Sequence, residues 1–266
     1  MIRDITIGQY YQTDSVIHRL DPRVKLSGTL LYIITLFLIG NVWGYLIATL
    51  ALALVVRLSK VPFGFIVRGM KAIGFLLAIT VVFNMFLTPG EALFSFWIFT
   101  LTKEGLRTAL FMGWRLCLLI IGSSLMTLTT TPNHLTDGLE KSLHVLNKVG
   151  VPVHEIAMMM SISLRFIPIL LEETDKIMKA QIARGADFES GNLLQRAKAM
   201  VPLLVPLFIS AFRRANDLAM AMESRCYRGG QGRTKMKPLA YEKRDMLGYG
   251  CIFLFMAVAI FAGRFF

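Results

Sequence analysis

Two arginines are the residues of this 266-residue chain best suited to binding a partner. Arg184 and Arg225 each come at the end of a long helical pattern, beside small residues. A guanidinium can bind a carboxylate through two parallel hydrogen bonds, and small neighbours allow a partner to approach closely. We therefore predict a docking site on a cytoplasmic surface, formed by Arg184, Arg225, Ala183, Gly185 and Ser224.

A simpler interpretation explains the first of these endings. Arg184 is a cation in the last helical turn, which the helix macrodipole favours, and Gly185 suits a left-handed cap. The second ending fits this interpretation less well, because Arg228 and Gly229 follow Arg225. Two similar endings on two similarly built helices favour a paired docking device, but capping remains an alternative for each arginine alone.

Catalytic patterns are missing from the sequence. It contains no Gly-x-x-x-x-Gly-Lys-Ser/Thr phosphate-binding loop and no Gly-x-Ser-x-Gly. His154-Glu155 begins like a zinc-protease motif, but Met158 occupies the second histidine position. Neither the remaining histidines nor the cysteines have ligand or disulfide spacing: His18, His134, His144, Cys117, Cys226 and Cys251. We predict no catalytic, cofactor-binding or metal-binding residues.

Composition points to a membrane protein. The chain is 55% hydrophobic and 17% charged, whereas soluble domains carry about 25% charged residues. Several apolar runs approach the roughly 20 residues that cross a bilayer. The net charge of +12 could indicate nucleic-acid binding, but basic loops on the cytoplasmic face of a membrane explain it more simply. The predicted fold class is an all-α, multi-span integral membrane protein with long cytoplasmic coupling helices.

The first half of the chain contains four predicted spans. Residues 26–58 are nearly all apolar, are interrupted at Gly40-Asn41 and have basic residues on both flanks. The positive-inside rule therefore predicts a helical hairpin. Asp21 and Pro22 suit an N-cap and a first helical position, although a second role in binding the interior helices is equally open. Residues 72–87 and 106–128 are the third and fourth spans. The start of the chain shows no cleaved signal peptide.

Two features of this half have open interpretations. Residues 91–105 are rich in aromatic side chains, which indicates a belt at the outer membrane interface without predicting its secondary structure. Arg115 lies within the fourth span, where an arginine is a candidate functional residue by default. The interpretation that we favour is that its long side chain reaches the outer interface.

The second half is organised differently. An amphipathic helix from Pro132, ended by Gly150 and Pro152, is expected to lie along the membrane. Residues 153–183 and 192–227 form two helices that begin apolar and become charged. A basic linker at 229–246 precedes a last span at 247–262. We predict three parts, at 1–130, 131–230 and 231–266, with the N-terminus and the coupling helices in the cytoplasm and the C-terminus outside.

The sequence resembles the transmembrane coupling subunits of energy-coupling factor (ECF) vitamin transporters of the cell membrane. The residues that carry this resemblance are Asp21-Pro22-Arg23-x-Lys25, Ala183-Arg184-Gly185, Ala221-Met222-Glu223-Ser224-Arg225-Cys226-Tyr227-Arg228-Gly229-Gly230 and the run from Gly232 to Leu239. The resemblance covers essentially the whole chain. The sequence departs from the family pattern at Cys226, where glycine is usual, and this questions how tightly the second end docks.

The resemblance implies that the subunits of the transporter have separate roles. The arginine-tipped helices would dock on two ATP-binding, ATP-hydrolysing subunits and transmit their motion to a small membrane subunit that captures the vitamin. Methionines along the helices suit a surface that repacks against several interchangeable capture subunits, although ordinary packing explains them equally well. The chain itself would bind no cofactor. The competing classes are a membrane enzyme and a self-contained carrier or channel, for which the spans offer little beyond Arg115 and Asn84.

Overall fold

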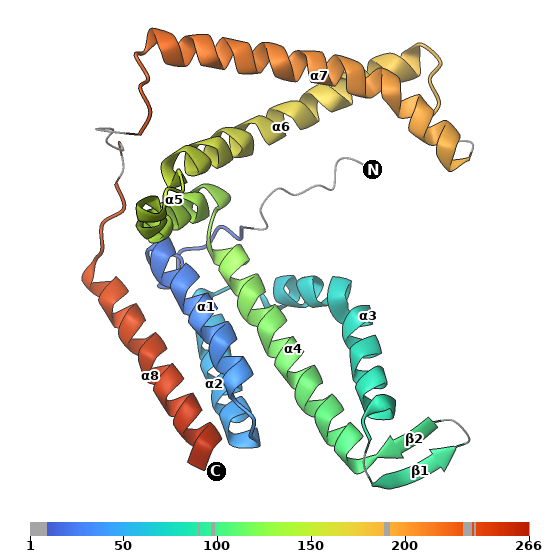
Figure 1. Ribbon diagram of the computed structural model, residues 1–266, viewed down its shortest axis with the longest axis vertical. Helices are drawn as coiled ribbons and strands as arrows, with labels where there is room; N and C mark the ends of the chain where they lie inside the picture. The colour runs from blue at the N-terminus through green and yellow to red at the C-terminus, as the bar shows by residue number, and fades with distance from the viewer. Residues whose placement is uncertain are drawn as a thin grey trace. The chain divides into compact units, whose positions relative to one another are not determined.

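The computed structural model describes residues 10–89, 91–96, 99–188, 192–230, 236 and 238–265. These residues are mostly helical, as predicted, and form two compact units (Figure 1). One unit lies within residues 142–238. Among the described residues, the other combines those up to 141 that begin at residue 10 with those from 239 onward. Most of the run 232–239, which contributed to the family resemblance, lies outside the described residues.

The predicted hairpin of the first two spans is confirmed as two helices. These are α1 (Pro22–Leu38) and α2 (Val42–Ser59), separated at Gly40-Asn41. Pro22 occupies the first turn of α1, where its missing N–H costs nothing. The Asn41 side-chain amide donates to the Gly263 carbonyl at 3.0 Å, so the turn is tied to the end of the chain's last helix.

The next helices are α3 (Phe63–Leu87) and α4 (Lys103–Thr129). α3 begins at Phe63, well before the predicted span. Pro62 lies just before the helix, where its missing N–H is tolerated, and the apolar pattern starts directly after it. Between α3 and α4 lies an antiparallel hairpin of β1 (Ala92–Phe96) and β2 (Phe99–Thr102). The aromatic segment therefore adds a short hairpin to the helical fold. Trp97, which belongs to that segment, lies outside the described residues.

The last helix, α8 (Lys243–Phe265), completes the larger unit. It packs against α1 and α2, which also contact α4, and α3 packs against α4. The centre of this packing is a cluster of buried residues: Leu36, Ile39, Tyr45, Ala48, Leu52, Leu118 and Ala259. A second cluster joins α3, α4 and the loop after α2 at Val61, Ile66, Leu125 and Leu128. The first and last described helices, α1 and α8, therefore contribute to one core.

One predicted helix of the middle region changes character along its length. The amphipathic pattern forms α5 (Pro132–Leu143) and then a 3₁₀ segment, η2 (His144–Val149). Gly150, which was predicted to end the helix, follows that segment in the left-handed conformation, at φ 86°. The α-helical prediction for residues 144–149 was wrong, because periodicity does not distinguish the last α turn from a 3₁₀ turn.

The two long helices of the smaller unit are α6 (Val153–Ala183) and α7 (Leu193–Ser224). α6 contains Pro168, and α7 contains Pro202 and Pro206. α7 bends near the end of its first third (Figure 1), and prolines are the ordinary cause of such a bend.

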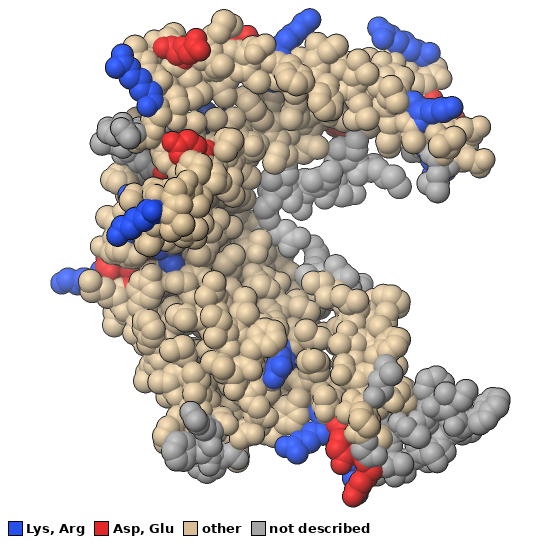
Figure 2. All heavy atoms as spheres, viewed as in Figure 1, with Lys and Arg blue, Asp and Glu red and all other residues tan. Residues whose placement is uncertain are grey.

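Five described helices are long and apolar enough to cross a membrane, which agrees with the predicted multi-span class. They are α2, α4, α6, α7 and α8. A shorter apolar helix spans Ile73–Phe86 within α3. Figure 2 shows a mostly uncharged surface between the two ends of the larger unit. α6 and α7 satisfy the length and composition criteria as well, so their predicted cytoplasmic position remains a prediction.

Candidate docking site

The end of α6 is a Schellman motif that presents Arg184. Arg184 is the C-cap and Gly185 follows at φ 90°. The Gly185 N–H donates to the Ile182 carbonyl at 2.9 Å, and the Ala186 N–H donates to the Gln181 carbonyl at 3.0 Å. These two bonds satisfy carbonyls that every helix leaves open at its C-terminus. The two capping bonds therefore fix the backbone of Arg184 at the end of the helix.

The end of α7 has the same geometry. Arg225 is the C-cap, and Cys226 follows in the left-handed region at φ 55°. The Cys226 N–H donates to the Glu223 carbonyl at 2.8 Å, and the Tyr227 N–H donates to the Met222 carbonyl at 3.0 Å. The two predicted arginine endings are therefore built alike in their backbone as well as in their composition.

The five predicted site residues are all exposed: Arg184, Arg225, Ala183, Gly185 and Ser224. Their arrangement confirms the left-handed cap at Gly185 and extends it to the second end. Each guanidinium follows a helix C-terminus, where a cation is electrostatically favoured. Capping and docking are therefore compatible, because the cap fixes the backbone and leaves the arginine side chain exposed.

The two ends differ in the residue that takes the left-handed conformation, which is Cys226 at the end of α7 and Gly185 at the end of α6. An L-residue in the left-handed region places its Cβ close to the following carbonyl, at a cost of about 1–2 kcal/mol. At Gly185 the corresponding space is open, so the strain of a side chain there would come from the backbone angle alone. The second end keeps the capping geometry of the first end at an energetic cost that the first end avoids.

Side chains of α6 and α7 hold the two helices against each other. Arg214 and Glu173 form an ion pair at 2.6 Å, and Gln181 Nε2 donates to the Pro202 carbonyl at 3.3 Å. The early part of α6 lies against the loop after α7, where a Cβ on Gly230 would come within 2.3 Å of the His154 ring. The contacts run in antiparallel order, so the two arginines lie at opposite ends of the pair.

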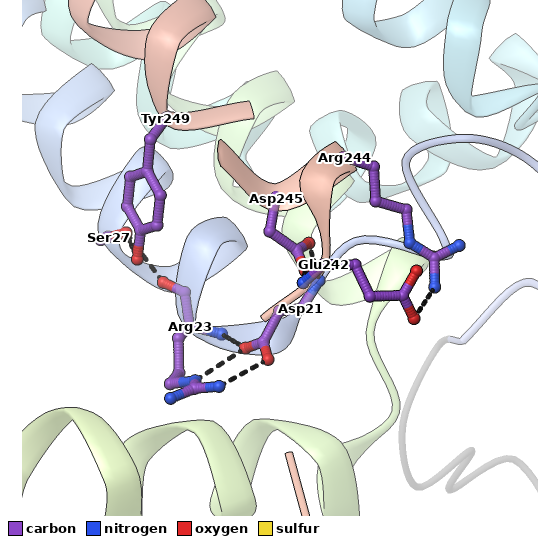
Figure 3. A network of polar contacts seen from close by, with 7 residues as sticks. All are labelled: Asp21, Arg23, Ser27, Glu242, Arg244, Asp245 and Tyr249. Atoms are coloured by element: carbon purple, nitrogen blue, oxygen red, sulfur yellow. Dashed lines mark hydrogen bonds and ion pairs between the residues drawn. The ribbon is translucent and has the colours of Figure 1, made fainter. Parts of the chain in front are cut away.

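A buried polar network joins the beginnings of α1 and α8 (Figure 3). Asp21 caps α1 as predicted, since its carboxylate accepts from the Arg23 N–H at 2.8 Å. The Asp245 carboxylate accepts from the Asp21 N–H and from the Glu242 N–H, both at 2.8 Å. Asp245 is 2% exposed. One carboxylate therefore satisfies the backbone at the start of two helices that are distant in the sequence.

Arg23 completes this network. Its guanidinium forms two hydrogen bonds to the Asp21 carboxylate, at 3.0 and 2.9 Å, and lies 3.7 Å from the centre of the Tyr241 ring. Burial alone would raise the pKa of Asp21, but the hydrogen bonds and charge of Arg23 outweigh it and hold that pKa below its usual value. The Asp-Pro-Arg motif therefore starts α1 and also contacts Tyr241 and Asp245, which is the second role that the sequence left open.

Lys25, the last residue of that motif, connects three segments. Its ammonium donates to the His18 carbonyl at 3.1 Å and to the Thr129 carbonyl at 2.8 Å. Thr129 is the last residue of α4, so the lysine occupies a helix C-terminus where a cation is stabilised. Sequence reasoning found Lys25 as a flanking charge but not these contacts.

Asp245 and Glu242 were missed entirely, because they fall within the stretch interpreted as a basic linker. The signal was present as Glu242-x-x-Asp245, an acidic residue three positions after a polar one at the start of an apolar run. The network belongs to the larger unit, whereas Arg184 and Arg225 belong to the smaller one.

Arg115 has defined partners within the larger unit. Its Nε donates to the Tyr45 hydroxyl at 2.7 Å, and one terminal nitrogen donates to the Ile39 carbonyl at 3.3 Å. Ile39 is the C-cap of α1, so Arg115 satisfies a carbonyl that the helix leaves open. The favoured interpretation of a side chain that simply reaches the interface was incomplete, because a tyrosine and a carbonyl hold the guanidinium in place.

Among the described residues, no three histidine, cysteine, aspartate or glutamate side chains come together in a way that could hold a metal ion.

Comparison with known proteins gives consistent matches. Residues 13–236 match the family described as CbiQ, cobalt transport protein. A protein of Clostridium kluyveri named energy-coupling factor transporter transmembrane protein EcfT is 55% identical over 262 residues, covering 98% of this chain and 97% of that protein. Proteins of the same name from Ruminiclostridium cellulolyticum and Bacillus subtilis are 52% and 48% identical, and cover 98% and 92% of this chain and 97% and 93% of their own.

Proposed function

Because the chain belongs to the EcfT/CbiQ family of transporter transmembrane proteins, we propose that it is the coupling component of an ECF-type importer. In this proposal two ATPase subunits dock on the arginine ends of α6 and α7. A small membrane subunit captures the vitamin. The chain itself performs no chemistry and transmits the motion that ATP binding and hydrolysis produce in the ATPases.

The observation that carries this proposal is the equivalence of the two helix ends. Both end in the same pair of capping bonds, and both place an exposed arginine at the C-cap. Two equivalent presentations suit two equivalent partners. An arginine held by a rigid cap loses less conformational freedom when it binds a carboxylate bidentately, which makes the cap useful for docking.

The apolar surfaces of α6 and α7 support a further membrane partner. Large hydrophobic side chains along both helices are exposed, including Met159 at 56% and Phe208 at 63%. An apolar surface of this kind marks an interaction site or contact with lipid. Exposed Met160, Met200 and Met220 add flexible thioethers, which adapt to different partner surfaces. We therefore propose that interchangeable capture subunits share this surface.

The remaining unit serves as the membrane anchor in this proposal. Its buried clusters and the Asp245 network tie α1, α2, α4 and α8 together. The basic flanks of these helices suit a cytoplasmic N-terminus, with the coupling helices on the same side. Reporter fusions at residue 1 and after residue 266 should place the two termini on opposite sides of the membrane.

The decisive experiment is purification of the full chain in mild detergent from its native membrane. Two ATPases and a small hydrophobic subunit should co-purify. The double variant Arg184→Ala, Arg225→Ala should lose the ATPases by more than a hundredfold, since each charge-assisted hydrogen bond contributes about 1.5–3 kcal/mol. A wild-type chain that purifies alone would refute the proposal.

A matched control separates docking from loss of charge. Arg165 and Arg213 are exposed arginines in the interior of the same helices. The double variant Arg165→Ala, Arg213→Ala removes the same charge and should keep the ATPases. Equal loss of the ATPases in both double variants would show that general charge, rather than the helix ends, holds the partners.

A further inference from the structure

The bend of α7 contains a backbone carbonyl that its own helix cannot satisfy. Pro206 has no N–H, so it cannot donate to the carbonyl of Pro202 four residues earlier. The Gln181 side-chain amide from α6 reaches this carbonyl, with Nε2 3.3 Å from the oxygen. The glutamine therefore replaces the hydrogen bond that the second proline removes.

The same glutamine also closes the end of α6. Its backbone carbonyl accepts from the Arg184 N–H at 3.1 Å and from the Ala186 N–H at 3.0 Å. Arg184, the arginine that docks in the proposed function, is the third residue after Gln181. One residue thus belongs both to the cap that presents Arg184 and to the bend of the neighbouring helix.

We propose that Gln181 is a positioning residue that couples the Arg184 end of α6 to the proline bend of α7. Displacing the end of α6 moves the residue whose side chain stabilises the bend, so the two helices change shape together. The bond itself follows from the geometry, whereas its role in transport rests on the proposed function.

The second contact between the helices fits this assignment. The Glu173–Arg214 ion pair joins α6 and α7 further from the bend, at 2.6 Å. An ion pair between flexible side chains tolerates rotation, whereas the Gln181 bond is directed at one carbonyl. The ion pair holds the helices together, and Gln181 sets the bend.

A double-mutant cycle on the assembled transporter tests this link. Gln181→Glu keeps the size of the side chain but replaces its donor with an acceptor. It should retain the ATPases and lower coupled uptake about fivefold, the factor equivalent to one net hydrogen bond of about 1 kcal/mol. Pro206→Ala restores the missing N–H, so in that background Gln181→Glu should have no further effect.

The controls make the outcome specific. Lys179→Ala changes an exposed neighbour on α6 and should leave uptake unchanged. The inference is overturned if Gln181→Glu behaves like Lys179→Ala. It is equally overturned if the Gln181→Glu loss is the same with Pro206 present and absent, because a general packing role would not depend on the proline.

A measurement on the chain alone separates this inference from the proposed function. Spin labels on Lys198→Cys and Asp217→Cys, with the three native cysteines replaced, report the distance across the bend. Gln181→Ala should broaden that distance distribution, and Pro206→Ala should abolish the effect. If no ATPase co-purifies but this pattern holds, the proposed function fails and the Gln181 link stands. An unchanged distribution would refute the link.

Discussion

Two pairs of arginines, one pair in each unit of this chain, are used in opposite ways. In the larger unit Arg23 and Arg115 bind a carboxylate, a hydroxyl and a carbonyl of their own chain. In the smaller unit Arg184 and Arg225 are exposed at helix ends. An arginine tied to its own chain contributes to folding, whereas one presented by a rigid cap can bind a partner. Substitutions in the larger unit should therefore affect stability, and substitutions at the helix ends should affect assembly.

The largest effect is expected at Asp245. Asp245→Ala removes the acceptor of two backbone N–H groups at helix starts, and each buried unsatisfied group costs about 1–3 kcal/mol. The free energy of unfolding should fall by about 3 kcal/mol. Thermal unfolding in detergent measures this loss, with the exposed neighbour Lys243→Ala as the control. A variant as stable as the control would show that the network does not hold α8 in place.

A smaller loss is expected from Tyr45→Phe. This change removes the hydroxyl that accepts from Arg115 and keeps the buried ring. Stability should fall by about 1–2 kcal/mol, because a charged donor loses a partner. Co-purification with the ATPases should be unchanged, as the comparison of the two units requires. Loss of the ATPases at full stability would contradict that comparison.

Cys226→Gly is expected to increase stability, whereas the substitutions above decrease it. Glycine adopts the left-handed conformation of this position without strain, so the end of α7 should be stabilised by about 1 kcal/mol. Hydrogen exchange of the Tyr227 amide measures this local gain. The reciprocal change, Gly185→Cys, should destabilise the end of α6 by a similar amount. If both changes are neutral, the two ends do not depend on their backbone angles in the way that the comparison assumes.

The smallest effect is a pH dependence in the larger unit. Burial lowers the pKa of His18 below 6.5, and nearby Lys25 adds to this, while the Tyr11 carbonyl opposes it. Because the folded pKa is lower than the unfolded value, this contribution to stability is present above pH 6.5 and is lost as the pH falls below it. Between pH 7.5 and 5.5 the wild type should lose slightly more thermal stability than His18→Gln. An equal loss would remove His18 as the cause.

The comparison also shows why sequence reasoning succeeded more with one unit than with the other. The bounds of α6 and the left-handed cap at Gly185 follow from local pattern and turn chemistry, and both were predicted. In the larger unit the helices were predicted, but the partners of Arg115 and the role of Asp245 were not. The Arg115 contacts and the contact between Asp245 and Asp21 join residues that are distant in the chain, and no local pattern encodes which of them meet.

The sequence by itself determined the membrane class, the hairpin break at Gly40-Asn41, the cap at Asp21 and the paired arginine ends. Each depends on composition, on periodicity or on the chemistry of a few adjacent residues. Only the tertiary structure decided that Asp245 satisfies two helix starts, that residues 144–149 form a 3₁₀ turn and that Gln181 reaches the carbonyl of Pro202. The physical reason is that a hydrogen bond between elements depends on packing, and packing brings together groups that the sequence separates.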